Sequence, residues 1–135
     1  LADAKVAPEL ESEARHYRSK ALVEANQLTH AVADWEALAK DTRNVYGAEA
    51  KYRLAQYLFD SGKTKEAEQE VLNYLEVSTP HAYWLARSFV LLSDIYAKLD
   101  RKLEARQYLL SLKQNYQADD DIAGMIESRL ENLSE

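Results

Sequence analysis

The chain of 135 residues contains no cysteine, only two prolines and only three glycines. The absence of cysteine excludes disulfide bonds and thiolate metal sites, although it does not assign a compartment. Few prolines and glycines means few of the residues that interrupt helices. No apolar run approaches the roughly 18–20 residues of a membrane-spanning helix. These absences favour a helical protein without direct membrane insertion.

Hydrophobic residues make up 47% of the chain and charged residues 30%, which is typical of a folded domain and too apolar for disorder. The net charge of −6 would repel a phosphate backbone, so we expect no nucleic-acid partner. We predict one domain over residues 1–135, long enough to bury about two thirds of the surface of its unfolded chain. The chain begins with Leu1 and shows no signal peptide, and we interpret it as a processed chain or an expressed fragment.

Three segments share one pattern, in which a turn-forming residue precedes an alanine by five positions. The segments are 26–31, 62–67 and 100–105. Their alanines are separated by 36 and then 38 residues, and a two-helix unit of that length is typical of an α-solenoid. Larger side chains recur four and seven positions after each alanine: Trp35, Val71 and Leu109, then Leu38, Tyr74 and Leu112.

The apolar spacing predicts seven helices and no strand. We expect helices at about 8–25, 46–60, 80–99, 101–116 and 119–133, and two more that begin after Thr29 and Thr64. Thr29, Thr64 and Thr79 are placed to supply helix N-caps, and Gly62 is placed to end a helix in the left-handed conformation. The helix at 80–99 is apolar nearly all round, which predicts a central position.

At these positions the chain resembles the tetratricopeptide repeat (TPR) family over about residues 8–116. The family's motif runs from a turn residue through an aromatic residue and an alanine to a second aromatic residue and a proline. Gly62, Ala67, Val71 and Pro80 match it in outline, as does the segment 26–35.

The sequence also departs from the family pattern. Thr64 and Lys102 replace the aromatic residue after the turn, and the family's early tryptophan falls on Lys51 and Phe89. These departures make the repeats degenerate.

The resemblance implies an all-α fold, an α-α superhelix or TPR-like solenoid of about three helix-turn-helix repeats plus a C-terminal capping helix. The expected repeats are 8–41, 46–78 and 80–116, with the capping helix at 119–133. It also implies a non-catalytic scaffold for protein–protein interaction, as a fragment of a larger bacterial TPR protein. Parts of the chain are similar to the looser TPRs of Gram-negative envelope proteins, which favours a periplasmic or cell-envelope location over a cytoplasmic one.

In TPR proteins the first helix of each repeat lines a concave groove that holds a protein or peptide partner. The alanine register transfers this groove to His16, Lys20, Glu49, Tyr52, Arg53, Gln56, Arg87 and Asp94, and also to Glu13, Phe59 and Val90. Arg53 and Arg87 could grip a carboxylate there. The alternative interpretation is that these are solvated residues or contacts between repeats.

No catalytic, cofactor or metal site is predicted. The three histidines, His16, His30 and His81, include no pair three or four positions apart, as metal ligation would favour. The Asp119–Asp121 run lacks the glycine and the distal glutamate of a calcium loop. Carboxylates at a helix N-terminus are favourable in themselves, so we interpret the run as capping.

Two other functions stay open at this point. The first helix could present an apolar face (Tyr17, Ala21 and Leu22) to another copy, which would make the chain a self-association module. Alternatively, the chain could be a helical ligand-binding or enzymatic domain with its site in the groove. A deep pocket with convergent polar groups would favour this second alternative.

Overall fold

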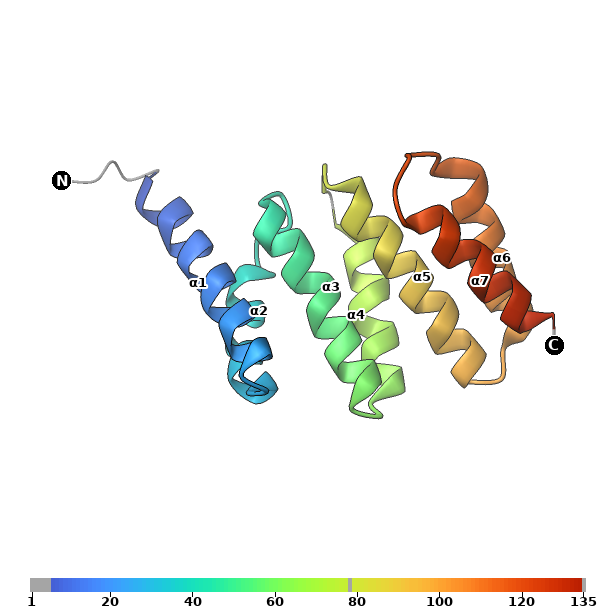
Figure 1. The fold of residues 1–135 in the computed structure, drawn as a ribbon, viewed down its shortest axis with the longest axis horizontal. Helices are drawn as coiled ribbons and strands as arrows, with labels where there is room; N and C mark the ends of the chain where they lie inside the picture. Colours follow the sequence, from blue (N-terminus) through green and yellow to red (C-terminus); the bar gives the residue numbers. More distant parts are fainter. Residues whose placement is uncertain (1–5, 78, 135) are drawn as a thin grey trace.

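The computed structural model describes residues 6–77 and 79–134, all of whose regular structure is helical. The helices are α1 (Val6–Glu24), α2 (Leu28–Leu38), α3 (Val45–Asp60), α4 (Thr64–Glu76), α5 (Ala82–Lys98), α6 (Lys102–Asn115) and α7 (Ile122–Leu133) (Figure 1). The predicted all-α fold class is therefore confirmed for this part of the chain. Ser78, the expected end of the second repeat, lies outside the described residues.

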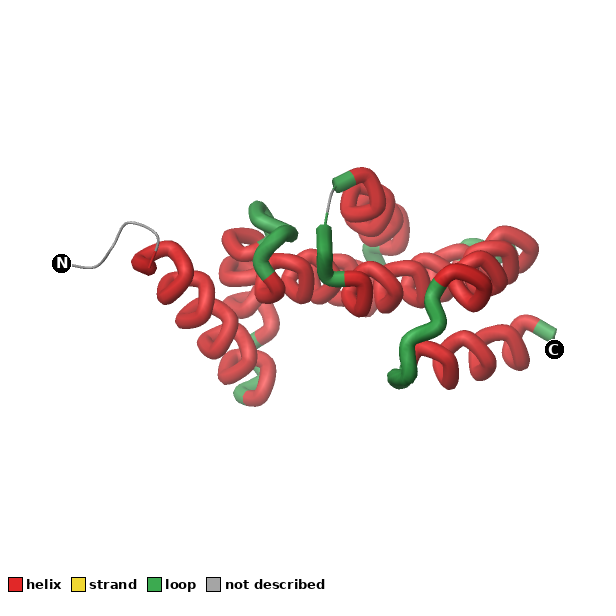
Figure 2. The backbone as a smooth tube through the Cα atoms, turned by 90° about the horizontal axis from the view of Figure 1, so that it is seen from above, coloured by secondary structure: helices red, strands yellow, loops and turns green. Residues whose placement is uncertain are grey.

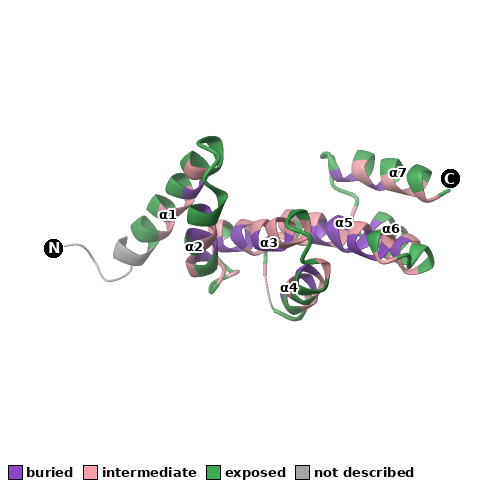
Figure 3. Cartoon of the chain, turned by 90° about the horizontal axis from the view of Figure 1, so that it is seen from below, coloured by how far each residue is buried: buried purple, intermediate pink, exposed green. Residues whose placement is uncertain are grey.

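The helices form a row of antiparallel neighbours. α1 packs on α2, α3 on α4 and α5 on α6, and α7 packs on both α6 and α5 (Figure 1). The odd-numbered helices also contact one another along the row, whereas the even-numbered helices do not. The row therefore bends around α3 and α5, and α1 and α7 rise on the side opposite α4 (Figures 2 and 3). We call the surface of α1, α3, α5 and α7 on that side the concave face.

Three turns between paired helices have the same backbone geometry. Asn26, Gly62 and Asp100 are left-handed, with φ of 60°, 83° and 61°. The amide of the next residue in each turn donates to a carbonyl five positions back, at 2.8 Å (Gln27 to Leu22), 2.9 Å (Lys63 to Leu58) and 2.8 Å (Arg101 to Tyr96). This is the Schellman helix stop. The prediction for Gly62 is confirmed, and two residues that are not glycine do the same.

The alanine of each turn segment lies where two helices cross. Ala31, Ala67 and Ala105 are each 0% exposed. The larger side chains four and seven positions later are also buried, at 7% exposure or less. A small residue lets the backbones approach while the large ones fill the layer behind it. The repeated sequence pattern is therefore a packing pattern.

Helix N-caps are where the predictions fail. Thr29 and Thr64 are not N-caps, because Gln27 and Lys63 hold those positions without a side-chain bond. The left-handed turn already sets the path of the chain into each helix, so no cap is needed to direct it. Thr79 does not start a helix either, since α5 begins at Ala82. Its hydroxyl accepts from the His81 amide (3.2 Å) and donates to the Thr42 carbonyl (2.8 Å), so it joins two loops.

The other helix predictions agree with the structure. α5 is central, since it contacts α3, α4, α6 and α7. The Asp119–Asp121 run does lie at the start of α7: Asp121 holds the N-cap position without a side-chain bond, and the Asp120 carboxylate accepts from the Ile122 amide at 2.9 Å. Between α1 and α2, the Arg18 guanidinium forks onto both carboxylate oxygens of Asp34, a residue only 2% exposed. This ion pair supplies the counter-charge that a buried carboxylate requires.

Candidate functional site

The predicted groove residues all lie on α1, α3 and α5, three of the four helices that form the concave face (Figure 3). Eight of them fall into a cluster at the centre of the row, a cleft between α1 and α3, and two positions that stand apart, whereas Glu13, Phe59 and Val90 join neither the cluster nor the cleft. Only the first two groupings bring several polar side chains together. They are therefore the candidate sites for a partner.

The aromatic–arginine cluster joins α3 to α5. It consists of Tyr52, Arg53, Tyr83, Trp84 and Arg87. Arg87 donates from Nη1 to the Tyr83 hydroxyl (2.9 Å) and from Nη2 to the Tyr52 hydroxyl (3.0 Å). Its guanidinium lies 4.9 Å from the centre of the Tyr52 ring, and that of Arg53 lies 5.5 Å from the centre of the Trp84 ring. Two cations therefore share one aromatic platform, which stabilises each by cation–π attraction.

The two arginines differ in their acidic partners. Arg53 Nε lies 3.4 Å from the Glu49 carboxylate, one turn earlier on α3. Arg87 makes no ion pair with any described residue, and reaches a carboxylate only through the Tyr83 hydroxyl, which donates to Asp121 at 2.9 Å. Burial raises the pKa of Tyr83, with Arg87 opposing and Asp121 adding to the shift. Arg87 is thus a partly buried cation held by neutral oxygens.

Burial corrects two of the predicted groove residues. Tyr52 is 5% exposed, so its ring belongs to the core and only its hydroxyl serves the concave face, where it also donates to Gln56 at 3.1 Å. Val90 is 3% exposed and packs with α6 and α7 residues, so its assignment to the groove is wrong. Both positions are on the correct helix, but a single register cannot distinguish a side chain at the surface from one just beneath it.

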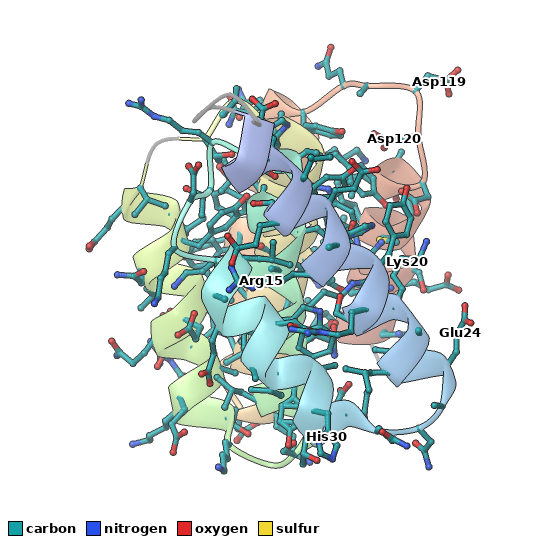
Figure 4. The ribbon with its side chains drawn as sticks, turned by 90° about the vertical axis from the view of Figure 1, so that its left-hand side faces the viewer. Arg15, Lys20, Glu24, His30, Asp119 and Asp120 are labelled. Atoms are coloured by element: carbon teal, nitrogen blue, oxygen red, sulfur yellow. The ribbon has the colours of Figure 1, made fainter. Side chains whose placement is uncertain are left out.

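A cleft of about 460 Å³ separates α1 from α3. It is lined by Ser19, Lys20, Val23, Glu24, Leu28, Trp35, Glu49, Arg53, Gln56, Tyr57, Asp60 and Ser61. Four predicted groove residues (Lys20, Glu49, Arg53 and Gln56) are therefore brought together here. Figure 4 shows Lys20 and Glu24 along one edge of α1, with Arg15 on the opposite edge. Exposed residues at the rim open the cleft to solvent, which favours a binding trough over an enclosed catalytic pocket.

His16 and Asp94 stand apart from both groupings. The His16 ring stacks on Tyr46, with 4.3 Å between ring centres, and burial lowers the pKa of His16 while Glu49 raises it. Asp94 faces α7, where Arg129 lies 3.3 Å away at the edge of a cavity of about 240 Å³. Burial raises the pKa of Asp94 and Arg129 lowers it. Both residues thus have partners within the chain.

The remaining candidates are limited by what the described residues contain. Within residues 6–77 and 79–134, no three His, Cys, Asp or Glu side chains are grouped so that they could hold a metal ion. None of the helices in these ranges is both long and apolar enough to cross a membrane.

On α1, Tyr17 is 55% exposed, but Leu22 packs with the Trp35 core cluster. The apolar face expected for self-association therefore lacks Leu22.

Sequence reasoning missed the part that α5 and α7 play together. The Trp84 ring lies against α3, with 5.7 Å between its centre and that of the Tyr52 ring. Its place beside Arg53 had no signal in the sequence. Asp121, predicted only as part of the capping run, accepts from the Tyr83 hydroxyl, and Arg129 of α7 pairs with Asp94 on α5. These contacts depend on how α7 crosses α5, which spacing along one helix does not encode.

Comparisons with protein-family models, with curated proteins and with solved structures found no match for the chain. Function is therefore inferred from the repeated turn geometry and from the side chains of the concave face.

Proposed function

We propose that the chain is a TPR-like solenoid and a non-catalytic scaffold that binds a segment of a partner protein along its concave face. Its three identical turns and its buried alanine crossings support the repeat architecture. Contacts that run only within a helix pair or between adjacent pairs, with α7 following the third pair, support it as well. In this proposal the chain is part of a larger bacterial TPR protein of the cell envelope, which the full-length gene product would test directly.

Arg87 is the observation that carries the proposal. A guanidinium has five N–H donors, and Arg87 spends two of them on neutral phenol oxygens. The Tyr52 and Tyr83 hydroxyls hold the guanidinium plane of Arg87 in place, so Arg87 has little side-chain entropy left to lose on binding. A bidentate bond to an incoming carboxylate would supply the opposite charge that the described residues do not provide. The partner segment is therefore expected to carry an acidic side chain or a chain terminus.

The histidines support a binding role over a catalytic one. His16 is stacked on Tyr46, and the His81 ring lies 2.8 Å from the backbone oxygen of Arg43. His30 is exposed at the start of α2. Among the described residues, none of the three imidazole rings hydrogen-bonds to a hydroxyl that it could activate as a nucleophile, which is the arrangement that covalent catalysis requires.

Binding to an array of short acidic, neutral and basic peptides tests the proposal. Arg87→Gln should weaken binding of the acidic peptides by about tenfold or more, because a bond to a charged group contributes about 1.5–3 kcal/mol. Tyr52→Phe keeps the buried ring but removes one oxygen that orients Arg87, so a smaller loss is expected. Tyr52→Ala is unsuitable, since it would leave a cavity in the core.

Lys98→Gln is the matched control, because Lys98 is an exposed cation in the last turn of the same helix. It removes the same charge at a distance from the cluster and should leave peptide binding unchanged. Equal losses in the Arg87 and Lys98 variants would mean that only the general charge of the chain matters. Binding that ignores peptide charge altogether would rule out Arg87 as the recognition residue.

A further inference from the structure

The α1–α3 cleft has an apolar side that the described chain leaves uncovered. Val23 is 42% exposed and Leu28 is 40% exposed, although both line the cleft and neither belongs to a core cluster. Trp35 and Tyr57, whose ring centres are 6.5 Å apart, also line it. Large apolar side chains at a concave surface are typical of an interaction site.

The rim of the same cleft is acidic. Glu24 has no ion-pair partner among the described residues, and Asp60 receives only the Gln56 amide, at 2.8 Å. Glu49 and Arg53 partly neutralise each other, and Lys20 is the remaining cation. The rim therefore carries one more negative charge than positive, which favours an apolar occupant that brings a cation with it.

A surface of matching character lies on α6. Leu103 is 70% exposed and Leu110 is 47% exposed, and residues seven apart lie on the same side of a helix. Lys102 and Arg106 flank Leu103 along the helix. Lys102 makes no ion pair with a described residue, whereas Arg101 pairs with Glu68 and Glu104. We call Leu103 and Leu110, with Lys102 and Arg106, the α6 stripe.

We propose that the α1–α3 cleft of one copy receives the α6 stripe of a second copy. Leu103 would cover Val23 and Leu28, and Lys102 would lie near Glu24 or Asp60. This binding is distinct from carboxylate recognition at Arg87, and it uses the helix-in-groove mode. It also differs from pairing through the outer face of α1, because only the side of α1 that borders the cleft takes part in the contact.

The two surfaces lie far apart in the row, on the first two pairs and on α6 (Figure 1). The α6 stripe of one chain therefore cannot fill the cleft of the same chain. When two copies bind, one of them still has a free cleft and the other a free stripe. Such a heterologous contact produces rings or open chains rather than a closed twofold dimer. Because a contact made by one helix stripe is small and small interfaces bind weakly, association should increase visibly as the protein concentration rises.

Sedimentation velocity over a concentration series tests this. The wild-type chain should shift from a monomer of 15.4 kDa to larger species as concentration rises. Leu103→Asp and Leu28→Asp should each weaken association at least tenfold. Both changes are conservative for the fold, since Leu103 is largely exposed and an acidic residue is favourable in the first turn of α2. Circular dichroism and the melting temperature would verify folding.

Mixing the two variants gives the sharpest result. Leu103→Asp retains an intact cleft, and Leu28→Asp retains an intact stripe, so each alone should stay monomeric. Together they should form a one-to-one dimer and nothing larger, because the other two surfaces are blocked. The charge reversals Lys102→Glu and Glu24→Lys, both at exposed positions, should behave in the same complementary way.

Leu10→Asp is the control, since Leu10 is 56% exposed on α1 but does not line the cleft. It should leave association unchanged. The proposal is overturned if the wild type stays monomeric throughout the series, if Leu103→Asp associates like wild type, or if the mixed variants form no dimer. Loss of association in Leu10→Asp would move the interface to the outer face of α1 and would equally overturn it.

Discussion

The three residues at the helix stops differ in the energetic cost of their left-handed conformation. Asn26 and Asp100 hold the left-handed conformation with a side chain present, while Gly62 holds it at φ 83° without one. Asparagine and aspartate tolerate this region because their short polar side chains bond locally. The three turns therefore have one geometry but not one energy, and the middle turn is the one that relies on glycine.

Gly62→Ala and Gly124→Ala should have opposite effects on the free energy of unfolding. At Gly62 the new side chain meets no atom within 4 Å, so the expected loss of about 1 kcal/mol is purely conformational. At Gly124, inside α7, there is also open space, and alanine should add about 0.5–1 kcal/mol through helix propensity. Urea unfolding of both variants measures this. A loss at both positions would show that packing, not backbone conformation, decides the effect.

His16 should make stability depend on pH. Its pKa is lowered in the folded chain from an ordinary value of 6.5, chiefly by burial. The unfolded chain therefore binds the proton more readily, and the contribution of His16 is complete above about pH 6.5 and is lost as pH falls through the folded pKa. Melting temperatures between about pH 7.5 and pH 5 should fall less in His16→Phe than in wild type.

His30 is the internal control for this measurement, because it is exposed at the start of α2. His30→Gln should retain the pH dependence of the wild type. If the melting temperatures of His16→Phe and of the wild type change identically with pH, then the carboxylates alone cause the pH dependence. The prediction that protonation of His16 destabilises the folded chain would then be wrong.

At the scale of helices and loops, the sequence predicted what local chemistry decides. The three left-handed stops and the small alanine crossings recur in the sequence because each needs a particular residue type at one position. The N-caps at Thr29, Thr64 and Thr79 were predicted wrongly because a helix start does not need a particular residue type. A hydroxyl before a helix is helpful but not required. Thr79 shows this best, as its hydroxyl joins the 79–81 turn to the Thr42 carbonyl.

The loop before α3 shows where local reasoning ends. A side chain on Gly47 would place its first carbon 1.8 Å from the Asp41 backbone oxygen, so the loop packs directly on the helix there. Nothing in the spacing of apolar residues marks this approach. The candidate site has the same limit: the alanine register chose the correct helices, but the pairing of Arg87 with two phenols depends on how α3, α5 and α7 cross.

Over the whole molecule, burial is uneven along the row. α5 has eight buried residues, including Leu92 and Ile95 at 0% exposure. On α1, Ser19 alone is buried among residues 9–24. In a linear array each pair is supported only by its neighbours, so the ends open at lower free energy than the middle.

Amide hydrogen exchange should therefore be slowest in α5 and fastest in α1, with α2 in between because it packs on both α1 and α3. Exchange measured by mass spectrometry on the native chain gives the order directly. Uniform protection across the row would indicate a single cooperative unit, and the description of the chain as a linear array would then be wrong.

Arg53 belongs both to the aromatic–arginine cluster and to the lining of the cleft, so binding at one of these places should affect the affinity of the other. Its guanidinium is at once a neighbour of Trp84 and the counter-charge of Glu49. A carboxylate bound at Arg87 would draw Arg53 away from Glu49, and the rim of the cleft would become more negative. A basic stripe from a second copy would then bind more tightly. By linkage the reverse holds as well, so occupancy at either place would raise affinity at the other by the same factor.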